Sequence, residues 1–505
     1  MKKRTGLFGR TPALLAAVVV VAGCTVIRVG PDYDEGQTWS EANAQAAARA
    51  LTSSGVSTNL TFARASLWWE QFNDPLLTNL VWQAFATNRS LLAAQCAIRQ
   101  ARALVGMSVA TQIPQLDAKG GYTRYGTSIS SSPYFANNYD LNKYQAGFDA
   151  AWEIDIFGGN SRAIESAVAG YEASVSDYAS AMVSLGAEVA ATYINYRTAQ
   201  ANWEVACSNV VIQSNTWELV SSQTRSGLVS DLPLQQATYN LEQTKAQLPL
   251  IRFELEQYAN ALAVLTGRTP GDLQEGLASR CPIPSVASQT LCGVPAGFIR
   301  ERPDVRAAER RVAQAMAEIG VAKADFYPKF ALNGSIGLES LKWSKFADGG
   351  HRSLAYSFGP QFSWAIFRGG SILNNVRAKE AAHAAAFNSY EAALLTALRE
   401  VRDAISGYAN SEARVERLGK AVEAAHRAVT ISEDLYRRGL VSFNDVLLAQ
   451  RDLTSLEELL VKAQGQVAIQ LVQFYKSIGG GWACRQVAPG AGAAEPVDDG
   501  ALLKE

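Results

Sequence analysis

One sequence unit occurs twice in this chain of 505 residues, at an offset of 212 positions. The stretch RSGLVSDLPLQQATYNL, from Arg225 to Leu241, aligns with RRGLVSFNDVLLAQRDL, from Arg437 to Leu453. Gly267 aligns with Gly479 in the same way. The period is much longer than that of a solenoid repeat. The chain is therefore expected to contain two copies of one large structural unit, with the elements of one copy recurring in the other.

Long helices are the main elements expected in each copy. Proline stands in a first helical turn at Asp74-Pro75 and at Pro303-Asp304, where its missing N–H removes no helical hydrogen bond. The stretches 160–222 and 371–437 are rich in alanine and contain no proline. At 1.5 Å per residue each would form a helix about 95 to 100 Å long. A second helix is expected to return to the glycine that ends each copy.

Two strand-like segments lie between the first helix and the long helix of each copy. From Tyr144 to Ile156 every even position is apolar, while Asp149 and Glu153 occupy odd positions. This two-residue period indicates a β-strand with one apolar face. Hairpins are expected at 115–157 and 328–367. The residues expected on their apolar faces are Tyr144, Phe148, Trp152, Ile154, Tyr356, Phe358, Phe362 and Trp364.

The apolar strand faces need a covering, either a protein core or lipid. The long helices have an apolar seam of their own, with Leu394, Leu398 and Val401 at coiled-coil spacing, and the chain offers no second sheet. Lipid is therefore the favoured covering. Strands span a bilayer only as a closed barrel, and small barrels need about eight strands or more. Because one chain supplies four strands, several chains would have to share one barrel.

The N-terminus has the pattern of a secretory signal peptide. Four basic residues precede an apolar run that is too short to span a bilayer comfortably, and the run ends in VAGC, which resembles a bacterial lipobox. Cleavage after residue 23 would leave Cys24 at the N-terminus to carry lipid. The alternative is an ordinary signal peptide in which Cys24 is incidental.

The remaining chemistry of the sequence argues against catalysis. Cys281 and Cys292 bracket a short loop, and either a disulfide or two unpaired buried thiols would fit them. No His or Cys cluster has metal-ligand spacing, and no nucleophile, phosphate-loop or zincin motif occurs. The formal net charge of -1 gives no indication of nucleic-acid binding. No cofactor, metal, nucleic-acid partner or enzymatic activity is expected.

Several motifs together resemble the outer-membrane factor family, the TolC-like trimeric channels of Gram-negative bacteria. The resemblance is greatest to the lipoprotein branch that serves resistance-nodulation-division efflux pumps. It extends over nearly the whole mature chain, through VGPDY (29–33), LWWEQFNDPLLTNLVWQA (67–84), WEIDIFGG (152–159), RERPDVRAAER (300–310), FRGG (367–370), GLVSFNDVLLAQRDL (439–453) and FYKSIGGGW (474–482). It implies a homotrimer with a shared 12-stranded membrane β-barrel and a long α-helical barrel across the periplasm. It also implies contact with outer-membrane lipid, a periplasmic adaptor and an inner-membrane pump.

The resemblance further implies a gate at the periplasmic ends of the helices. Asp445 matches the family's first acidic gate position and Tyr436 matches a tyrosine of its inter-helix network, whereas the second acidic position is Leu448 here. Each aspartate also has a possible role as a helix cap. Asp445 lies three residues after Ser442, as in a capping box, and Asp231 precedes Pro233, as an N-cap would. Both readings remain open for Asp445, and the cap is favoured for Asp231. The glycines expected to reverse the chain as left-handed C-caps are Gly227 and Gly439, and the other candidate gate residues are Arg225, Arg437 and Arg438.

The predicted organisation follows from these elements. It comprises a signal peptide at 1–23, a lipid-anchored segment at 24–73, a first repeat at 74–267, a periplasmic linker at 268–302, a second repeat at 303–479 and a disordered tail at 480–505. The expected function is that of the outer-membrane channel of a tripartite efflux pump, exporting drugs or other small toxic compounds. The alternatives are the outer-membrane channel of a type I protein secretion system and a coiled-coil lipoprotein without a pore. The sequence does not identify the exported substrate.

Overall fold

The computed structural model describes residues 28–38, 45, 66–126, 140–286, 296–349 and 351–482. The chain forms two compact units, which are described separately below. The first unit combines Met1–Thr38, Ile98–Ser174 and Ala308–Tyr390, and the second combines Trp39–Ala97, Val175–Ala307 and Glu391–Glu505. Among the described residues, no helix combines the length and the apolar character that crossing a membrane would require.

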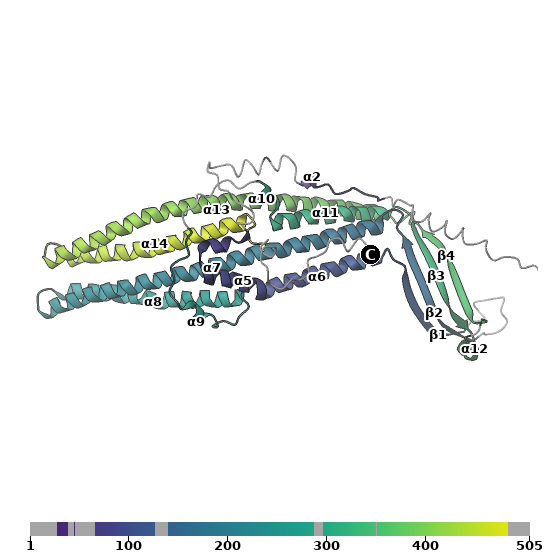
Figure 1. The fold of residues 1–505 in the computed structure, drawn as a ribbon, viewed down its shortest axis with the longest axis horizontal. Helices are drawn as coiled ribbons and strands as arrows, with labels where there is room; N and C mark the ends of the chain where they lie inside the picture. Colours follow the sequence, from purple (N-terminus) through teal and green to yellow (C-terminus); the bar gives the residue numbers. More distant parts are fainter. Residues whose placement is uncertain are drawn as a thin grey trace, which may run out of the picture. The chain divides into compact units, whose positions relative to one another are not determined.

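Most of the described chain is helical, and the four strands belong to the first unit (Figure 1). The elements in chain order are α2 (Glu35–Thr38), η1 (Trp68–Phe72), α5 (Pro75–Thr87), α6 (Arg89–Ala110), β1 (Gln115–Gly126), β2 (Asp140–Ile154), α7 (Gly159–Arg225), α8 (Asp231–Leu265), α9 (Gln274–Leu277), α10 (Ala296–Arg300), α11 (Pro303–Ala324), β3 (Lys329–Ser340), α12 (Trp343–Ala347), β4 (Leu354–Ser363), α13 (Ser371–Arg437) and α14 (Phe443–Ser477).

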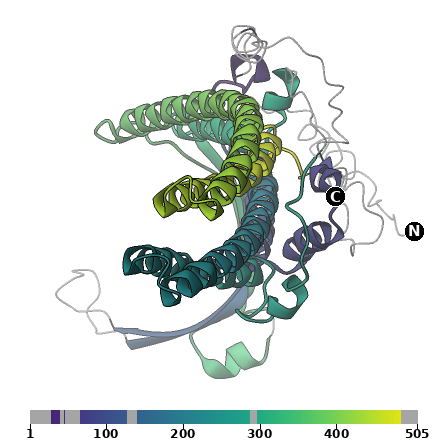
Figure 2. The ribbon, with the colours of Figure 1, turned by 90° about the vertical axis from the view of Figure 1, so that its left-hand side faces the viewer.

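The sequence duplication is also a structural one. Helices α7 and α13 each contain 67 residues, and α8 and α14 each contain 35. Their first and last residues differ by the same 212 positions that separate the sequence repeats. In the second unit α7 and α8 form one helical hairpin and α13 and α14 form another, as Figure 2 shows from the end that carries the two turns. The long helices expected at 160–222 and 371–437 are confirmed.

A glycine follows the first helix of each hairpin, at the start of the turn. Gly227 has a φ of +70° and Gly439 a φ of +74°, in the left-handed region expected of C-cap glycines. The amide of Leu228 donates to the carbonyl of Gln223 at 3.0 Å, and Leu440 donates to Leu435 at the same distance. This hydrogen bond, five residues back along the chain, is the signature of a Schellman motif. The prediction for the two turn glycines is confirmed.

The helical segment before the first hairpin differs from the expectation. The sequence predicts one helix there, but the structure has α5 and α6, separated at Asn88. The Asn88 side chain accepts a hydrogen bond from the amide of Leu91 at 3.0 Å, so this residue caps α6. Its own amide meanwhile donates to Ala84 of α5. Asn88 interrupts the segment because its side chain competes with the main chain for hydrogen bonds. The second repeat has the single helix α11.

The four strands form one antiparallel sheet in the order β1-β2-β3-β4. The two predicted hairpins are therefore joined edge to edge through β2 and β3, where Phe148 pairs with Ile336. The second strands end at Ile154 and Ser363, three and four residues before the ends of the predicted hairpins 115–157 and 328–367. Trp364 was expected in a strand, but it lies one residue beyond β4.

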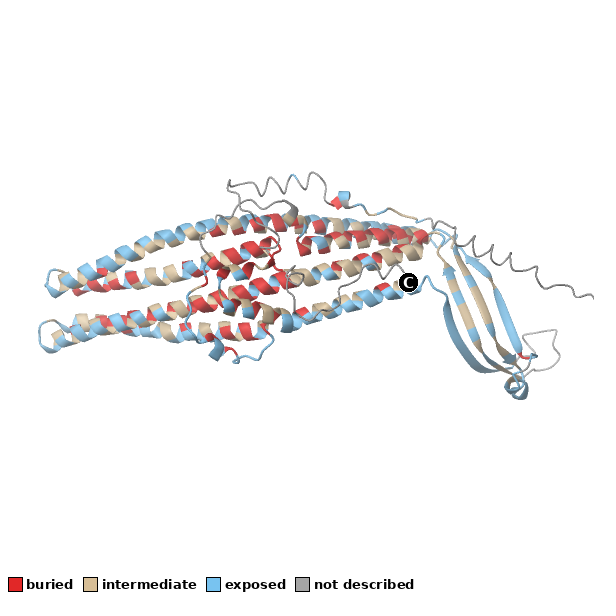
Figure 3. Cartoon of the chain, in the orientation of Figure 1, coloured by how far each residue is buried: buried red, intermediate tan, exposed pale blue. Residues whose placement is uncertain are grey.

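The second unit has an aromatic core beside the C-terminal end of α14. Trp68 stacks on Tyr475 with ring centroids 5.6 Å apart, and Trp69 is fully buried. Gly481, with a φ of +106°, lies against both indoles. Buried residues are dense in this region and become sparse toward the turns of the two hairpins (Figure 3). Gly480–Trp482 were predicted to belong to a disordered tail, but they form a turn packed on this core. Residues 483–505 lie outside the described residues.

Candidate functional site

The sheet has one apolar face and one polar face. Directly opposite residues of antiparallel strands lie on the same side of a sheet. The register joins Trp152 to Leu332 and Leu332 to Pro360 on one side, and Asp149 to Ser335 and Ser335 to Ser357 on the other. Large residues on the apolar face are exposed to different degrees. Phe148 is 53% exposed, Ile336 55%, Tyr356 71%, Phe358 84% and Phe362 72%. No described part of the chain covers this face fully.

Aromatic side chains gather near both ends of the apolar face. At one end the Tyr144 ring lies 5.0 Å from Tyr122, 5.4 Å from Trp343 and 6.1 Å from Phe346 between centroids. At the other end lie Trp152 and the pair Phe330 and Phe362, whose centroids are 6.2 Å apart. Eight residues separate Tyr144 from Trp152, which is about 26 Å along a strand. With the tilt of barrel strands this gives a height of about 20 Å, comparable with the roughly 25 Å apolar band between the aromatic girdles of membrane barrels.

The polar face is cross-linked by its own side chains. Lys119 forms an ion pair with Asp149 at 2.5 Å, and Lys143 forms one with Glu339 at 2.8 Å. A hydrogen bond of 2.9 Å joins the hydroxyls of Ser335 and Ser357 on β3 and β4. Charged groups at this density need water nearby, so this face suits an aqueous lumen and not a lipid surface.

A strap formed by residues 28–33 lies along α7 in the first unit. The amide of Val29 donates to the carbonyl of Phe157 at 3.3 Å, three residues beyond the end of β2. Arg162, only 1% exposed, donates to the carbonyls of Val29 and Gly30 and forms an ion pair with Asp32 at 2.6 Å. The strap is thereby fixed next to the point where the sheet gives way to helix.

The other end of the strap is held by Tyr33. Its hydroxyl donates to Glu309 of α11 at 3.0 Å, and the guanidinium of Arg310 lies 5.3 Å from its ring centroid. Burial is the main cause that raises the pKa of Tyr33 to about 12. The strap therefore connects α7 of the first repeat with α11 of the second.

The two candidate gate carboxylates have different local roles at the hairpin turns. One carboxylate oxygen of Asp445 accepts from the amide of Ser442 at 3.0 Å and from its hydroxyl at 2.7 Å, which closes a capping box at the start of α14. Asp231 was favoured as an N-cap, and this is wrong. The N-cap of α8 is Ser230, and Asp231 is the first helical residue, where it accepts a hydrogen bond of 3.3 Å from Gln235. Both aspartates are exposed.

Tyr436 connects the two hairpins near their turns. Its hydroxyl donates to Gln223 of α7 at 3.0 Å, and its ring lies 5.4 Å from that of Phe443 on α14. Burial raises the pKa of Tyr436 above its usual value. Tyr436 also packs with Leu234 against a small buried cluster formed by Val220, Ala237, Phe443 and Leu447. Leu448, the residue at the second acidic gate position that the resemblance implies, is 48% exposed.

The three candidate arginines are peripheral to this network. Arg438 forms an ion pair with Asp434 on its own helix at 2.8 Å, and Arg225 donates to the carbonyl of Ser221 at 3.4 Å. Arg437 is exposed. The most exposed apolar residues of the turns are Leu228, at 75%, and Leu440, at 68%.

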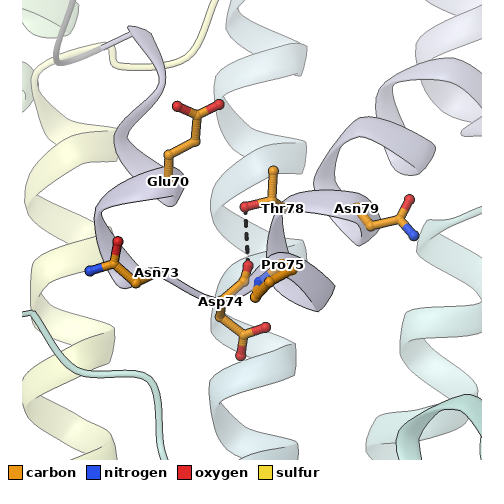
Figure 4. A pocket seen from close by; sticks show the side chains of 6 residues that line it. All are labelled: Glu70, Asn73, Asp74, Pro75, Thr78 and Asn79. Carbon is orange, nitrogen blue, oxygen red and sulfur yellow. Dashed lines mark hydrogen bonds between the residues drawn. The ribbon is translucent and has the colours of Figure 1, made fainter.

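A hollow of about 490 Å³ in the second unit is lined by Glu70, Asn73, Asp74, Pro75, Thr78 and Asn79 (Figure 4). One oxygen of Asp74 caps α5 by accepting from the amides of Leu76 and Leu77, and the other accepts from Tyr193 at 2.6 Å. Asp74 is thus committed to holding the start of α5 on α7. This arrangement is architectural.

Only one residue of the possible disulfide lies within the described part of the chain, so the pairing stays a prediction. Cys281 is exposed, so it is not the buried thiol of the other alternative. Cys292 and the lipidation candidate Cys24 lie outside the described residues.

Comparison with known proteins agrees with this geometry. The family model described as "Outer membrane efflux protein" matches residues 80–268 and 297–480, which together exceed half of the chain. The chain belongs to the outer membrane efflux protein family. This assignment confirms the resemblance and the fold class derived from the sequence.

Individual members of the outer membrane efflux protein family match along nearly their whole length. The chain is 30% identical to the solvent efflux pump outer membrane protein SrpC of Pseudomonas putida, with 93% of this chain and 98% of that protein covered. It is 28% identical to the outer membrane protein OprJ of Pseudomonas aeruginosa, over 94% of this chain and 97% of that protein. The solved outer-membrane channel OprN superimposes with a TM-score of 0.82 at 33% identity, covering 90% of this chain and 99% of that one. The open-state channel MtrE of Neisseria gonorrhoeae gives a TM-score of 0.76 at 26% identity, covering 90% and 98%.

Several residues that organise this outer membrane efflux protein were not predicted from its sequence. Gln223, Thr216 and Asn209 of α7 each bond to a residue of the other hairpin. Their spacing of seven residues places them on one face of α7, and it is the sequence signal from which they could have been found. Trp343 and Phe346 were also not predicted; they belong to α12, in the connection between β3 and β4.

Proposed function

We propose that this protein is the outer-membrane channel of a tripartite efflux pump and exports small toxic compounds as a homotrimer. The observation that supports the proposal most strongly is the sheet with one apolar face, two aromatic rows and a charged opposite face. Relatives named as solvent and toluene efflux pump outer membrane proteins support small apolar compounds as cargo. No catalytic role is proposed, in keeping with the family.

The edges of the sheet support assembly of several copies. Within the described residues β1 and β4 are the outer strands, with 12 and 10 residues, and neither has a second neighbour. Long exposed edges invite pairing with another chain. Because a membrane barrel must close, β4 of one copy would pair with β1 of the next. Three copies give twelve strands, above the minimum of about eight for a small barrel.

Exposed apolar residues on α6 support the same arrangement. Leu104 is 50% exposed and Met107 67%, and among all the residues of this helix only Leu91 and Val105 are buried. An amphipathic helix normally buries a continuous stripe. In a trimer the neighbouring copy would cover this face.

The strap supports lipid attachment at Cys24. Val29 is five positions after Cys24 and bonds to Phe157, three residues beyond β2. A fully extended chain of five residues spans at most about 18 Å. The acyl chains would therefore enter the membrane close to the row that contains Trp152, which is the periplasmic rim of the proposed barrel.

The hairpin turns are the proposed contact with the periplasmic adaptor. Leu228 and Leu440 occupy equivalent positions of the two repeats and are largely exposed. In a Schellman motif this position usually packs back on its own helix. Two exposed leucines at matching turns would give each copy two apolar contacts for a partner, and the inner-membrane pump would act through that adaptor.

The proposed gate combines charge and helix contacts at the same end. Three copies of Asp445 would approach one another around a threefold axis, and their mutual repulsion would be balanced by the Tyr436 contacts that hold the hairpins together. Asp231 would contribute a second, weaker ring. With Leu448 in place of a second acid, this gate would carry less charge than one with two carboxylates on α14.

Two measurements on the purified lipoprotein test the proposal. We expect an oligomer three times the chain mass that survives SDS until heated, and stepwise ion conductance after reconstitution in planar bilayers. Phe358→Asp on the apolar face should prevent oligomer formation, whereas the matched variant Ser357→Asp on the polar face should allow it. A soluble monomer without conductance after removal of the lipid would refute the channel and favour a structural coiled-coil lipoprotein.

A further inference from the structure

Helix α12 lies at the end of the apolar sheet face that is remote from Trp152. Its Trp343 and Phe346 rings stack on each other with centroids 5.6 Å apart, and they lie 5.4 and 6.1 Å from the ring of Tyr144 on β2. Tyr144 is on the same side of the sheet as Phe148, which is four positions further along the strand. Helix α12 therefore packs over the apolar side of the sheet, not over the charged side.

Hydrogen bonds fix the main chain of α12 against the two strands that it connects. The amide of Lys342, the N-cap of α12, donates to the hydroxyl of Ser340 at the end of β3 at 3.2 Å. The hydroxyl of Ser353, which directly precedes β4 and is only 5% exposed, donates to the carbonyl of Lys345 at 2.8 Å. Because both ends of the helix are held, the directions in which its side chains leave the main chain are fixed relative to the sheet.

The connection between β3 and β4, residues 341–353, carries a net positive charge. It contains Lys342, Lys345 and Arg352 but only one acid, Asp348. All four side chains are exposed, and none forms an ion pair with a described residue. Lys342 and Lys345 are three positions apart and so lie next to each other on the surface of the turn. Their ammonium groups repel each other, and an anion bound between them would offset this repulsion.

In the proposed channel α12 lies at the cell-surface end of the barrel. Strand β2 continues into α7 at its Trp152 end, which is the periplasmic rim, and α12 lies at the other end of the strand (Figure 1). Helix α12 contacts the central strands β2 and β3, whereas a neighbouring copy would pair along β1 and β4. The exposed apolar surface of Leu341, at 51%, and of Trp343, at 60%, is therefore left for the outer leaflet of the membrane.

We propose that α12 binds a phosphorylated glycolipid of the outer leaflet, of the lipopolysaccharide class. The ammonium groups of Lys342 and Lys345 bind a phosphate of its head group, and Leu341 and Trp343 contact its acyl chains. Lysines beside an apolar surface extend their charged ends toward the head-group region in this way. A zwitterionic phospholipid would not compensate the net positive charge, and a soluble anion would leave the apolar side chains uncovered. The inference rests on the proposed channel, which places α12 in the outer leaflet.

Native mass spectrometry of the purified full-length trimer counts bound lipid and gives its affinity. The probes are bisphosphorylated lipid A and phosphatidylcholine, which also has acyl chains but carries no net charge. We expect the native protein to bind lipid A at least tenfold more tightly than phosphatidylcholine. The double variant Lys342→Gln with Lys345→Gln should bind lipid A about 25-fold more weakly, since each cation near an anionic lipid surface contributes about fivefold. Its binding of phosphatidylcholine should not change.

Further variants separate the effects of charge, position and apolar contact. Lys342→Arg with Lys345→Arg keeps both charges and should bind lipid A within about twofold of the native protein. Lys420→Gln with Arg427→Gln removes two charges at exposed positions of α13 and should leave lipid binding unchanged. Trp343→Ala should weaken lipid A binding at least about threefold, because apolar contact with the acyl chains is lost. The fraction of SDS-resistant oligomer shows that each variant still folds and assembles.

Several results would overturn the proposal. One is equal weakening by the α12 lysine pair and the α13 pair, and another is equal affinity for the two lipids. Displacement of lipid A by millimolar inorganic phosphate would indicate a site for soluble anions instead. Loss of the trimer in the α12 double glutamine variant would make a second copy of the chain the occupant. A trimer that conducts ions without preferring lipid A would remove only this inference, whereas a monomer without conductance would remove the proposed channel itself.

Discussion

Trp152 and Trp364 make the same hydrogen bond in the two repeats. The indole of Trp152 donates to the carbonyl of Gln112 at 2.8 Å, and that of Trp364 donates to Phe326 at 2.9 Å. Each acceptor lies in the connection between a helix and the first strand of the same hairpin. An indole with an apolar body and one satisfied polar group suits the border between lipid and water. The two residues thus mark one rim of the apolar face.

Arginine substitutions on the apolar face should have effects that depend on depth. Phe148 lies midway between the two aromatic rows, so Phe148→Arg should destabilise the assembled barrel by about 2 to 4 kcal/mol. Trp152→Arg, at the rim, should cost about 0 to 1 kcal/mol from lipid contact. The fraction of SDS-resistant oligomer as a function of denaturant measures both. Equal costs at the two depths would contradict a lipid-facing assignment.

Changes on the polar face should alter ion selectivity and leave assembly intact. Asp149→Asn removes a carboxylate that pairs with Lys119, so the face gains net positive charge and cation preference should fall. The reversal potential under a salt gradient gives the permeability ratio, which should change at least twofold. Ser357→Ala on the same face is the uncharged control. If Asp149→Asn prevented oligomer formation and kept selectivity, the two faces would be reversed.

Two substitutions separate the capping role of Asp445 from a gating role. Asp445→Asn keeps an acceptor for the Ser442 amide but removes the charge, whereas Asp445→Ala removes both and should cost about 0.5 to 2 kcal/mol of stability. If the charge contributes to closure, both variants should raise the mean conductance in planar bilayers. A change in Asp445→Ala alone would assign the residue to capping. Unchanged conductance in both would exclude it from the gate.

The strap should detach at alkaline pH. The pKa of Tyr33 is raised to about 12, mainly by burial, from an ordinary value near 10. Because the folded state favours the protonated phenol, this contribution is complete below pH 10 and is lost as the pH rises through 12. Limited proteolysis should cleave near residue 33 faster at pH 11.5 than at pH 9. Tyr33→Phe should remove most of this pH dependence, while Tyr239→Phe, at an exposed tyrosine, should not.

Repeating patterns were predictable from the sequence. Which of several neighbouring polar groups makes a given hydrogen bond was not. The 212-residue offset and the strand alternation fixed the long helices and the faces of Phe148 and Asp149, because periodicity directly reports which side of an element is buried. Asp231 was misassigned because two adjacent residues, Ser230 and Asp231, are both good N-caps, and the structure places the helix start between them. The interruption at Asn88 depends on competition between a side chain and the main chain, which no periodicity reveals.

Some site residues depend on contacts between repeats. Gln223 and Tyr436 are 213 positions apart, and only the packing of two hairpins brings them together. A single sequence shows that each residue has a polar group, but it does not show which residue lies opposite. The same holds for Arg162, whose partners Val29, Gly30 and Asp32 lie about 130 positions away.

Accumulation of a small toxic compound in living cells tests the central claim most directly. Cells that lack this protein should retain a fluorescent cationic dye several-fold more than the parent. The native protein should restore efflux, Phe148→Arg should not, and secretion of proteins into the medium should be unchanged. Unaltered dye retention together with loss of a secreted protein would contradict the efflux assignment and identify a channel for protein secretion.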